Sequence, residues 1–262
     1  MGKQNSFETK NSLDRRSKII EMLESKGQVK VNDLAELFNI SDVTIRNDLA
    51  QLEKKGFLVR TRGGGIKFQR TGVDFKLTEK AKQHAAEKQA IGKKAAEIIK
   101  DNDTIIIDSG TTTSELAKNL RSIKNLSVIT NALNISSLLV DFDNLKVIML
   151  GGTIRHNSLS LIGPIAENNV KNYFCDKLFL GVDGIDSHYG ITTPNIEEAN
   201  LNKMMVEISN EVIVLVDSSK FLRRSFAFIS PISKINTVIT DINIPQDELT
   251  GLQNQGVKVI LV

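Results

Sequence analysis

The sequence predicts an α/β protein with a small N-terminal domain of helices and a hairpin, followed by a larger, mostly parallel α/β domain. The chain has 262 residues, about twice the roughly 100–150 of a common domain, so two unequal domains are expected. Beyond residue 104, short apolar runs rich in β-branched residues alternate with helix-like segments. That alternation is typical of a parallel sheet covered on both faces. Before residue 70, the apolar positions follow a helical period instead.

The charge of the chain is divided unevenly between these two parts. Residues 1–70 carry 14 Lys and Arg against 9 Asp and Glu, whereas the other 192 residues have a net charge of −2. A basic excess on a small segment suits binding to a phosphate backbone, although a motif is needed to support it. The composition, 40% hydrophobic and 25% charged, excludes a disordered, collagen-like or coiled-coil chain.

Three short helices are expected first. The first covers residues 13–26 and ends at a glycine, and the second covers residues 32–38. Residues 39–40 make a tight turn, and Ser41 is a good N-cap for a third helix that runs to about residue 55.

A hairpin should follow the third helix. Residues 57–59 and 66–68 read as two short strands around a basic tip that contains Arg60, Arg62 and Gly63–Gly65. The three glycines would allow close backbone approach to DNA and lack the spacing of a nucleotide-binding fingerprint. Helices followed by such a hairpin make a winged helix-turn-helix layout, which we assign to residues 1–70.

The third helix presents a polar face that could read DNA. Ile45, Leu49 and Leu52 share the inward face, so Arg46 and Asn47 point outward in the first turns, where a recognition helix meets base edges. Arg46 could pair with guanine and Asn47 with adenine; the alternative is the solvated surface of an ordinary helical bundle. The candidate DNA-binding residues are Ser41, Val43, Thr44, Arg46, Asn47, Arg60 and Arg62.

Residues 15–20, 31–38, 41–49 and 56–60 resemble the DNA-binding domain of DeoR-family bacterial repressors. The resemblance spans the whole N-terminal segment. It departs from the family at two expected DNA contacts, because Asn47 stands where the family usually has a second Arg and Arg62 where it usually has a His. The operator sequence therefore cannot be transferred from relatives.

The second domain, residues 87–262, is expected to follow a partly helical linker at residues 71–86, with one helix running from about residue 77 to 100. Seven strands are expected at residues 104–107, 126–129, 145–150, 177–182, 211–216, 237–240 and 257–262. Helices are expected at residues 113–120, 131–139, 197–208 and 246–253.

Small, polar and glycine-rich loops follow the first five of these strands. In open α/β sheets, ligands bind beyond the carboxyl ends of the strands, and the segment after the first strand offers hydroxyls and free backbone N–H groups to an anion. The alternative for this segment is a plain turn between a strand and a helix, in which the Ser and Thr side chains cap the helix. The loop residues are Asp108, Ser109, Gly110, Thr111, Thr112 and Thr113, then Thr130 and Asn131, Gly151 and Gly152, residues 181–186, and residues 217–220.

These loops resemble the sensor domain of the same family, which is similar to ribose-5-phosphate isomerase. The resemblance implies a phosphorylated sugar or sugar-alcohol ligand, with Ser109 to Thr113 around the phosphate and Asp183, Gly184, Glu198 and Lys220 at the polyol end or the phosphate. Glu198 could instead be a first-turn acid favoured by the helix dipole, and Lys220 a solvated loop lysine.

The resemblance implies a cytoplasmic transcriptional repressor of carbohydrate genes. It also implies that a phosphorylated sugar weakens the binding of this repressor to operator DNA. The alternative is an isomerase-like enzyme with an accessory DNA-binding domain. The isomerase has a lysine in the segment that corresponds to residues 188–193, where this chain has none, so an enediolate would lack a stabiliser. No catalytic residue is therefore assigned.

We expect no cofactor, no metal site and no membrane partner. The apolar runs are far shorter than the roughly 20 residues of a membrane span, residues 1–12 do not read as a secretory signal, and Cys175 should be a buried, inert thiol. A single winged domain buries little DNA surface, so we expect a homo-oligomer, either a dimer or a tetramer.

Overall fold

The computed structural model describes residues 12, 14–23, 27–55, 57–61, 63–67 and 74–262. The chain divides into two compact units, residues 1–70 and residues 71–262. Both units have the architecture that the sequence predicts.

The first unit packs helices against a small antiparallel sheet. Residues 14–23 are helical, and the elements that follow are β1 (Gln28–Lys30), α2 (Val31–Phe38), α3 (Asp42–Lys54), β2 (Leu58–Thr61) and β3 (Gly64–Lys67), with the strands in the order β1-β3-β2. The expected turn between α2 and α3 is present, because Asn39 adopts a left-handed conformation that ends α2. The core consists of Ile19, Leu23, Val29, Val31, Leu34, Ile45, Leu49, Leu52 and Leu58.

A buried ion pair ties the first helical segment to α3. Asp48 is only 4% exposed, and its two carboxylate oxygens lie 2.5 Å from Arg15 Nε and 3.0 Å from Arg16 Nε. Since a buried carboxylate without a partner is costly, these two arginines are structural and are not available for DNA.

The hairpin is longer than expected and its tip is shorter. β2 and β3 take in Arg60, Gly64 and Gly65, which pair across the two strands. A Cβ on Gly64 would lie 1.9 Å from the Val29 carbonyl oxygen, so Gly64 allows β1 to approach β3 closely. Gly64 was expected to allow the backbone to approach DNA closely, but in the structure it allows β1 and β3 to pack closely instead.

The second unit is built on one parallel sheet of seven strands. The strands are β4 (Thr104–Ile107), β5 (Leu126–Thr130), β6 (Leu145–Met149), β9 (Cys175–Gly181), β12 (Ser209–Leu215), β14 (Thr237–Thr240) and β15 (Lys258–Leu261), in the order β15-β14-β12-β9-β4-β5-β6. All neighbouring pairs are parallel. The seven predicted strands are therefore confirmed, with small shifts at their ends.

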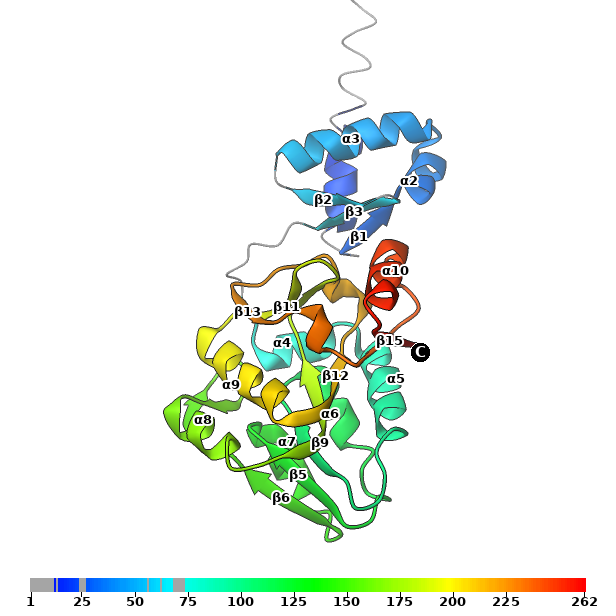
Figure 1. Ribbon diagram of the computed structural model, residues 1–262. Coiled ribbons are helices and arrows are strands. Elements are labelled where there is room, and N and C mark those ends of the chain that lie inside the picture. Colours follow the sequence, from blue (N-terminus) through cyan, green and yellow to red (C-terminus); the bar gives the residue numbers. More distant parts are fainter. Residues whose placement is uncertain (1–11, 13, 24–26, 56, 62, 68–73) are drawn as a thin grey trace, which may run out of the picture. The chain divides into compact units, whose positions relative to one another are not determined.

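Helices cover both faces of this sheet (Figure 1). Ile105 and Ile107 face one apolar core, and Ile106 faces the other, as alternation along a strand requires. The first core holds α5 (Ala85–Ala96), α6 (Thr111–Ala117) and α7 (Leu133–Leu139), and the second holds α8 (Pro164–Val170), α9 (Ile196–Glu207) and α10 (Gln246–Asn254). Gly92 lets α5 pass close to α6, because a Cβ there would lie 2.6 Å from the backbone of Leu116.

Three features differ from the expectation. The helix expected over residues 77–100 is divided into α4 (Leu77–Lys82) and α5 by Gln83 and by His84, which has a φ of 51°. A hairpin of β7 (Thr153–Arg155) and β8 (Ser160–Ile162) precedes α8, and β10 (Gly184–Asp186), β11 (Gly190–Thr193) and β13 (Ala227–Ser230) form a second sheet. These short strands carry polar residues and glycines, so they lack the apolar runs that marked the main sheet.

Within the part of the chain that the structure describes, no helix is both long and apolar enough to cross a membrane.

Candidate functional site

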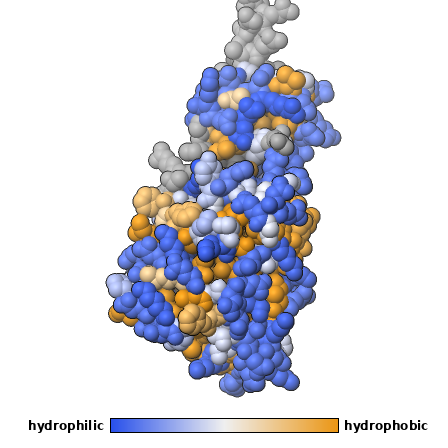
Figure 2. Space-filling model, in the orientation of Figure 1, coloured by the Kyte–Doolittle hydropathy of each residue, from blue (hydrophilic) through white to orange (hydrophobic). Residues whose placement is uncertain are grey.

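The outward face of α3 carries the candidate DNA-reading residues. Val43, Arg46 and Asn47 are exposed, whereas Ile45 and Leu49 are buried. Ser41 caps the helix as its side chain accepts a hydrogen bond from the Thr44 backbone N–H at 3.3 Å. In the view of Figure 2 the surface of this unit along α3 is mostly hydrophilic.

Of the hairpin candidates, Arg60 lies in β2 and is exposed. Its backbone N–H donates to Glu53 Oε1 at 2.9 Å, which fixes the strand next to α3 and leaves the guanidinium outside. Arg62 lies outside the described residues.

A cavity of about 60 Å³ lies at the carboxyl ends of β4, β9 and β12. The residues around it come from six separate stretches of the chain. They are Leu77, Lys80, Lys88, residues 108–112, Asn157, Ser158, residues 181–183, Thr193, Glu198, Asn202, residues 215–217 and Lys220.

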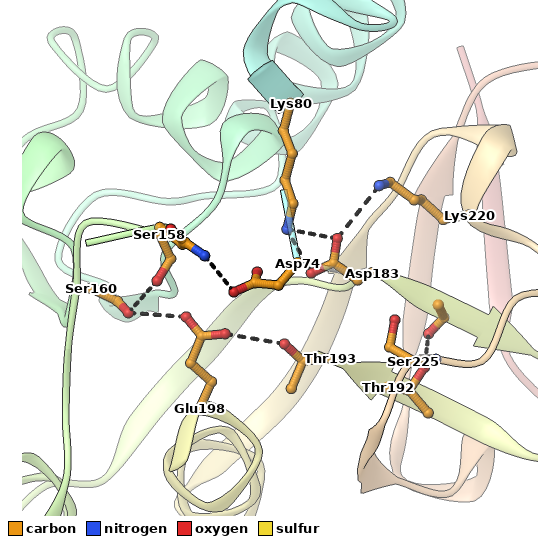
Figure 3. A network of polar contacts seen from close by, with 12 residues as sticks. Asp74, Lys80, Ser158, Ser160, Asp183, Thr192, Thr193, Glu198, Lys220 and Ser225 are labelled. Atoms are coloured by element: carbon orange, nitrogen blue, oxygen red, sulfur yellow. Dashed lines mark hydrogen bonds and ion pairs between the residues drawn. The ribbon is translucent and has the colours of Figure 1, made fainter. Parts of the chain in front are cut away.

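Asp183 stands between two lysines at this cavity. Lys80 Nζ from α4 lies 2.8 Å from its carboxylate and Lys220 Nζ 3.5 Å, and Figure 3 shows the two side chains reaching it from two sides. Burial alone would raise the pKa of Asp183, but the two ammonium groups lower this pKa below its ordinary value. Asp183 therefore stays ionised and can accept hydrogen bonds from ligand hydroxyls.

Glu198 is only 6% exposed and is fully engaged. Its Oε1 accepts hydrogen bonds from Arg155 at 3.1 Å and Ser160 at 3.0 Å, and its Oε2 accepts one from Thr193 at 3.2 Å. Glu198 also lies in the first turn of α9, where the helix dipole favours an acid, and its backbone N–H donates to the side chain of the Asn195 N-cap. Glu198 thus links α9 to the β7–β8 hairpin, as Figure 3 shows in part.

The loop after β4 places Asp108 through Thr112 on the cavity wall. Burial raises the pKa of Asp108 well above its ordinary value, and the charge of Glu198 adds to this effect. The Ser109 backbone N–H donates to Asn131 Oδ1 at 3.0 Å. Thr130 supports the same loop, because its hydroxyl donates to the Ile107 carbonyl at 2.7 Å.

Lys88 is a further cation on the cavity wall. Its Nζ donates to the carbonyl oxygens of Lys80 at 2.5 Å and Gln83 at 2.7 Å, so it caps the end of α4. The pKa of Lys88 is lowered to about 8, mainly by burial, while the charge of Asp217 opposes this change and the charges of Lys220 and Lys80 add to it.

Several candidate residues lie near the cavity without lining it. Thr113, Thr130 and Asn131 are buried beneath the loop after β4. A Cβ on Gly152 would lie 2.6 Å from the Ile162 carbonyl in β8, and one on Gly184 2.5 Å from the Arg223 carbonyl in the loop before β13, so these two glycines allow neighbouring backbone segments to pack closely. Gly151 has a φ of 73° at the turn after β6.

Sequence reasoning missed Lys80, Lys88, Arg155 and the turn at Asn157 and Ser158. Lys80 and Lys88 belong to the segment around the expected linker, and Arg155 to an unexpected hairpin. One signal was available: Lys88 shares the inward helix face with Ile91 and Ala95, and a lysine on an apolar face is costly unless it has partners there.

Cys175 is buried, as expected, and burial raises the pKa of its thiol to about 11. It therefore stays protonated at neutral pH. Among the described residues, no group of three His, Cys, Asp or Glu side chains could hold a metal ion.

Comparison with known proteins gives two family matches. Residues 15–70 match the DeoR-like helix-turn-helix domain, and residues 83–242 match the DeoR C terminal sensor domain. Together these models account for most of the chain.

Two relatives match nearly end to end. A protein of Escherichia coli O157:H7 named as an aga operon transcriptional repressor is 42% identical over 95% of this chain and 93% of its own. The lactose phosphotransferase system repressor of Staphylococcus epidermidis (strain ATCC 35984) is 32% identical over 89% of this chain and 93% of its own.

Among solved structures, ribose 5-phosphate isomerase A from Neisseria gonorrhoeae is 19% identical, with a TM-score of 0.39, over 52% of this chain and 53% of that one.

Proposed function

Because this chain belongs to the DeoR family of transcriptional regulators, we propose that it represses genes of carbohydrate metabolism and that a phosphorylated sugar weakens its hold on the operator. The family and the near full-length relatives make it a DNA-binding regulator rather than an enzyme. We assign residues 1–70 to DNA binding, residues 71–86 to the linker and residues 87–262 to effector binding, and we place the protein in the cytoplasm.

For DNA binding, we propose that Arg46 and Asn47 read base edges from the exposed face of α3, with Arg60 and Arg62 at the backbone or the minor groove. Arg46 supports this role because, within the described residues, it forms an ion pair with Asp42 alone, at 4.0 Å, and its side chain is 56% exposed. A guanidinium held so weakly is available to pair with guanine or phosphate.

The observation that carries the effector proposal is the convergence of Lys80, Lys88 and Lys220 on one cavity that also holds Asp183. The ammonium groups that remain on the cavity wall favour an anionic phosphate, whereas an ionised Asp183 favours hydroxyl groups. A phosphorylated sugar or sugar alcohol carries both. Ser109 to Thr112 would contribute hydroxyls and backbone N–H groups on the wall of the same cavity.

We also propose that the protein acts as a homo-oligomer, a dimer or a tetramer, on repeated half-sites. Apolar side chains are exposed in the second unit, among them Ile196, Phe226 and Phe228. Figure 2 shows hydrophobic residues at the surface near β13 and at several other places on this unit. Such residues are suited to contact with a second copy.

A thermal-shift screen of the full chain tests the effector proposal. The panel contains glucose, galactose and fructose 6-phosphates, ribose 5-phosphate and glycerol 3-phosphate, each beside its unphosphorylated parent. An ester present at 100 times its dissociation constant should stabilise the folded protein by about 2.7 kcal/mol. Equal stabilisation by an ester and its parent would contradict a phosphate-binding role.

A further inference from the structure

Residues 74–82, which we call the strap, lie across the edge of the effector cavity. Lys80 reaches Asp183 at 2.8 Å, and the Leu77 backbone N–H donates to the Asn157 carbonyl at 2.6 Å. Asp74 forms an ion pair with Arg155 and accepts a hydrogen bond from Asn157 Nδ2 at 2.7 Å. The strap is thus bound to three residues at the cavity or beside it, and Asp183 and Asn157 both line the cavity.

These contacts are polar, and little apolar packing supports them. No side chain of α4 is buried, whereas the rest of the cavity is held by strands and helices of the two apolar cores. A second cavity, of about 170 Å³, lies between α4 and α6. Asp74 Oδ1 is buried without a hydrogen-bond partner. The strap is therefore the part of the cavity wall that costs least to move.

The cavity is small for the proposed effector while the strap is in place. Its volume of about 60 Å³ is below the roughly 300–1,000 Å³ of ordinary ligand sites. In addition, Lys80 Nζ lies on the Asp183 carboxylate. Movement of the strap would enlarge the cavity and would free Asp183 to accept further hydrogen bonds from ligand hydroxyls.

We propose that the strap and the effector compete for the same site, so that effector binding displaces residues 74–82 from the cavity. This inference rests on the proposed function. Asp183 would exchange Lys80 for ligand hydroxyls, and Arg155 would exchange Asp74 for ligand oxygens or water. Lys80 would leave with the strap, so Lys88 and Lys220 would remain on the cavity wall to bind the phosphate. Asp74 follows the last residue of the first unit, Arg70, by only four positions in the sequence, so the strap is the part of the cavity wall next along the chain to the DNA-binding unit. Displacement at the cavity would then reach the operator without a rearrangement of the main sheet.

The test compares Asp74→Asn with Glu79→Gln in the full chain. Asp74→Asn weakens the ion pair to Arg155. Glu79 is exposed on the same strap and does not line the cavity, so Glu79→Gln removes the same charge without touching a strap contact. If the strap competes, Asp74→Asn should tighten binding of whichever 6-phosphate from the panel binds the wild type, on the order of threefold to tenfold, since it raises the fraction of open sites. Glu79→Gln should leave that affinity within about twofold.

Amide hydrogen exchange at Leu77 gives an independent readout, because its N–H is bonded to Asn157 only while the strap is closed. Exchange should be slow in the free wild type, faster in Asp74→Asn, and faster in the wild type when the 6-phosphate is added. Slower exchange on adding the 6-phosphate, or weaker binding by Asp74→Asn, would show that the strap closes onto the ligand and would overturn the proposal.

The two proposals fail in distinguishable ways. If no panel compound stabilises the wild type, the sugar-phosphate proposal has failed. The amide exchange rate of Leu77 in the ligand-free proteins then tests whether the Asp74 contact holds the strap against the cavity. If this rate is equal in the wild type and in Asp74→Asn, the contact does not hold the strap closed and the inference is wrong.

Discussion

The two units of this protein use charged residues in opposite ways. In the first unit, the buried Asp48 and its partly buried partners Arg15 and Arg16 hold helices together, and the candidate DNA-reading residues are exposed on α3. In the second unit, the candidate ligand-binding charges are themselves partly buried, and they satisfy one another across the cavity. A DNA backbone is large and needs an open surface, whereas a small anion is bound best where water is excluded.

The largest expected effect tests the structural role of buried charge in the first unit. Asp48→Ala leaves two arginines without their partner, so it should lower the free energy of opening of α3 by about 2–4 kcal/mol. This is measured by amide hydrogen exchange in the full chain. The control is Glu36→Ala on the exposed side of α2, which should change the free energy by less than about 0.5 kcal/mol. If amide exchange in α3 is unchanged in Asp48→Ala, the ion pairs of Asp48 do not stabilise the first unit, and the contrast drawn between the two units is wrong.

The next prediction concerns Lys220, a charge in the second unit that is assigned to ligand binding. Lys220→Gln keeps length and polarity but removes one ammonium group, so effector binding should weaken by about 1.5–3 kcal/mol. Operator affinity without effector should stay near the wild-type value. Calorimetry with the panel compound that binds measures the first quantity, and Lys234→Gln, at an exposed lysine, is the matched control. Loss of DNA binding in a folded Lys220→Gln protein would contradict its assignment to the effector.

Arg46 provides the corresponding test in the first unit. Arg46→Ala should cost about 1–3 kcal/mol of operator affinity, with relaxed preference at one base pair if it contacts a base, or a uniform loss if it contacts phosphate. Effector affinity should not change. Lys54→Ala, in the last turn of α3, removes a charge of the same sign away from the first turns. Equal binding of wild type and Arg46→Ala to operator and to random duplex would exclude Arg46 as a reader.

The sequence was sufficient to predict α3 and its outward face because both depend on local rules. The period of Ile45, Leu49 and Leu52, and the Ser41 cap, lie within one helix, and the structure has both. The seven strands of the main sheet were likewise marked by continuous apolar runs. The loop at Asp108–Thr112 followed from its place after β4.

The remaining part of the cavity depends on which distant segments meet. Lys80, Arg155 and Asp183 are brought together by α4, by the β7–β8 hairpin and by the loop after β9. Asp183 was a candidate because it follows a predicted strand, but Lys80 and Arg155 have no local signature, since a lysine on a short polar helix reads as a solvated residue. The pairing of Asp48 with Arg15 and Arg16 was missed for the same reason.

The smallest expected effect is a pH dependence that only the second unit should show. The pKa of Lys88 is about 8, so this lysine changes from mainly charged at pH 7 to mainly neutral at pH 9. A phosphate monoester stays fully ionised over that range. Effector affinity should therefore fall about threefold to tenfold from pH 7 to pH 9 in calorimetric titrations, and Lys88→Gln should flatten the profile.

Folding stability should respond to Lys88 in the opposite direction. Its pKa in the folded state is below its ordinary value of 10.5, so between about pH 8 and 10.5 the unfolded chain holds the proton more tightly, and the Lys88 contribution to stability rises with pH. Lys93→Gln, at an exposed neighbour on α5, should alter neither profile. If the effector affinity does not change across pH 8, the charge of Lys88 does not contribute to effector binding.

The most direct test of the account is release of full-length protein from a labelled operator duplex, selected beforehand from a random pool, followed by fluorescence anisotropy while panel compounds are added. The account predicts that one sugar phosphate releases the wild-type protein, that its unphosphorylated parent does not, and that Lys220→Gln stays bound at concentrations that free the wild type. Release by ester and parent at equal concentrations, or no difference between Lys220→Gln and the wild type, would contradict control of the operator through this cavity.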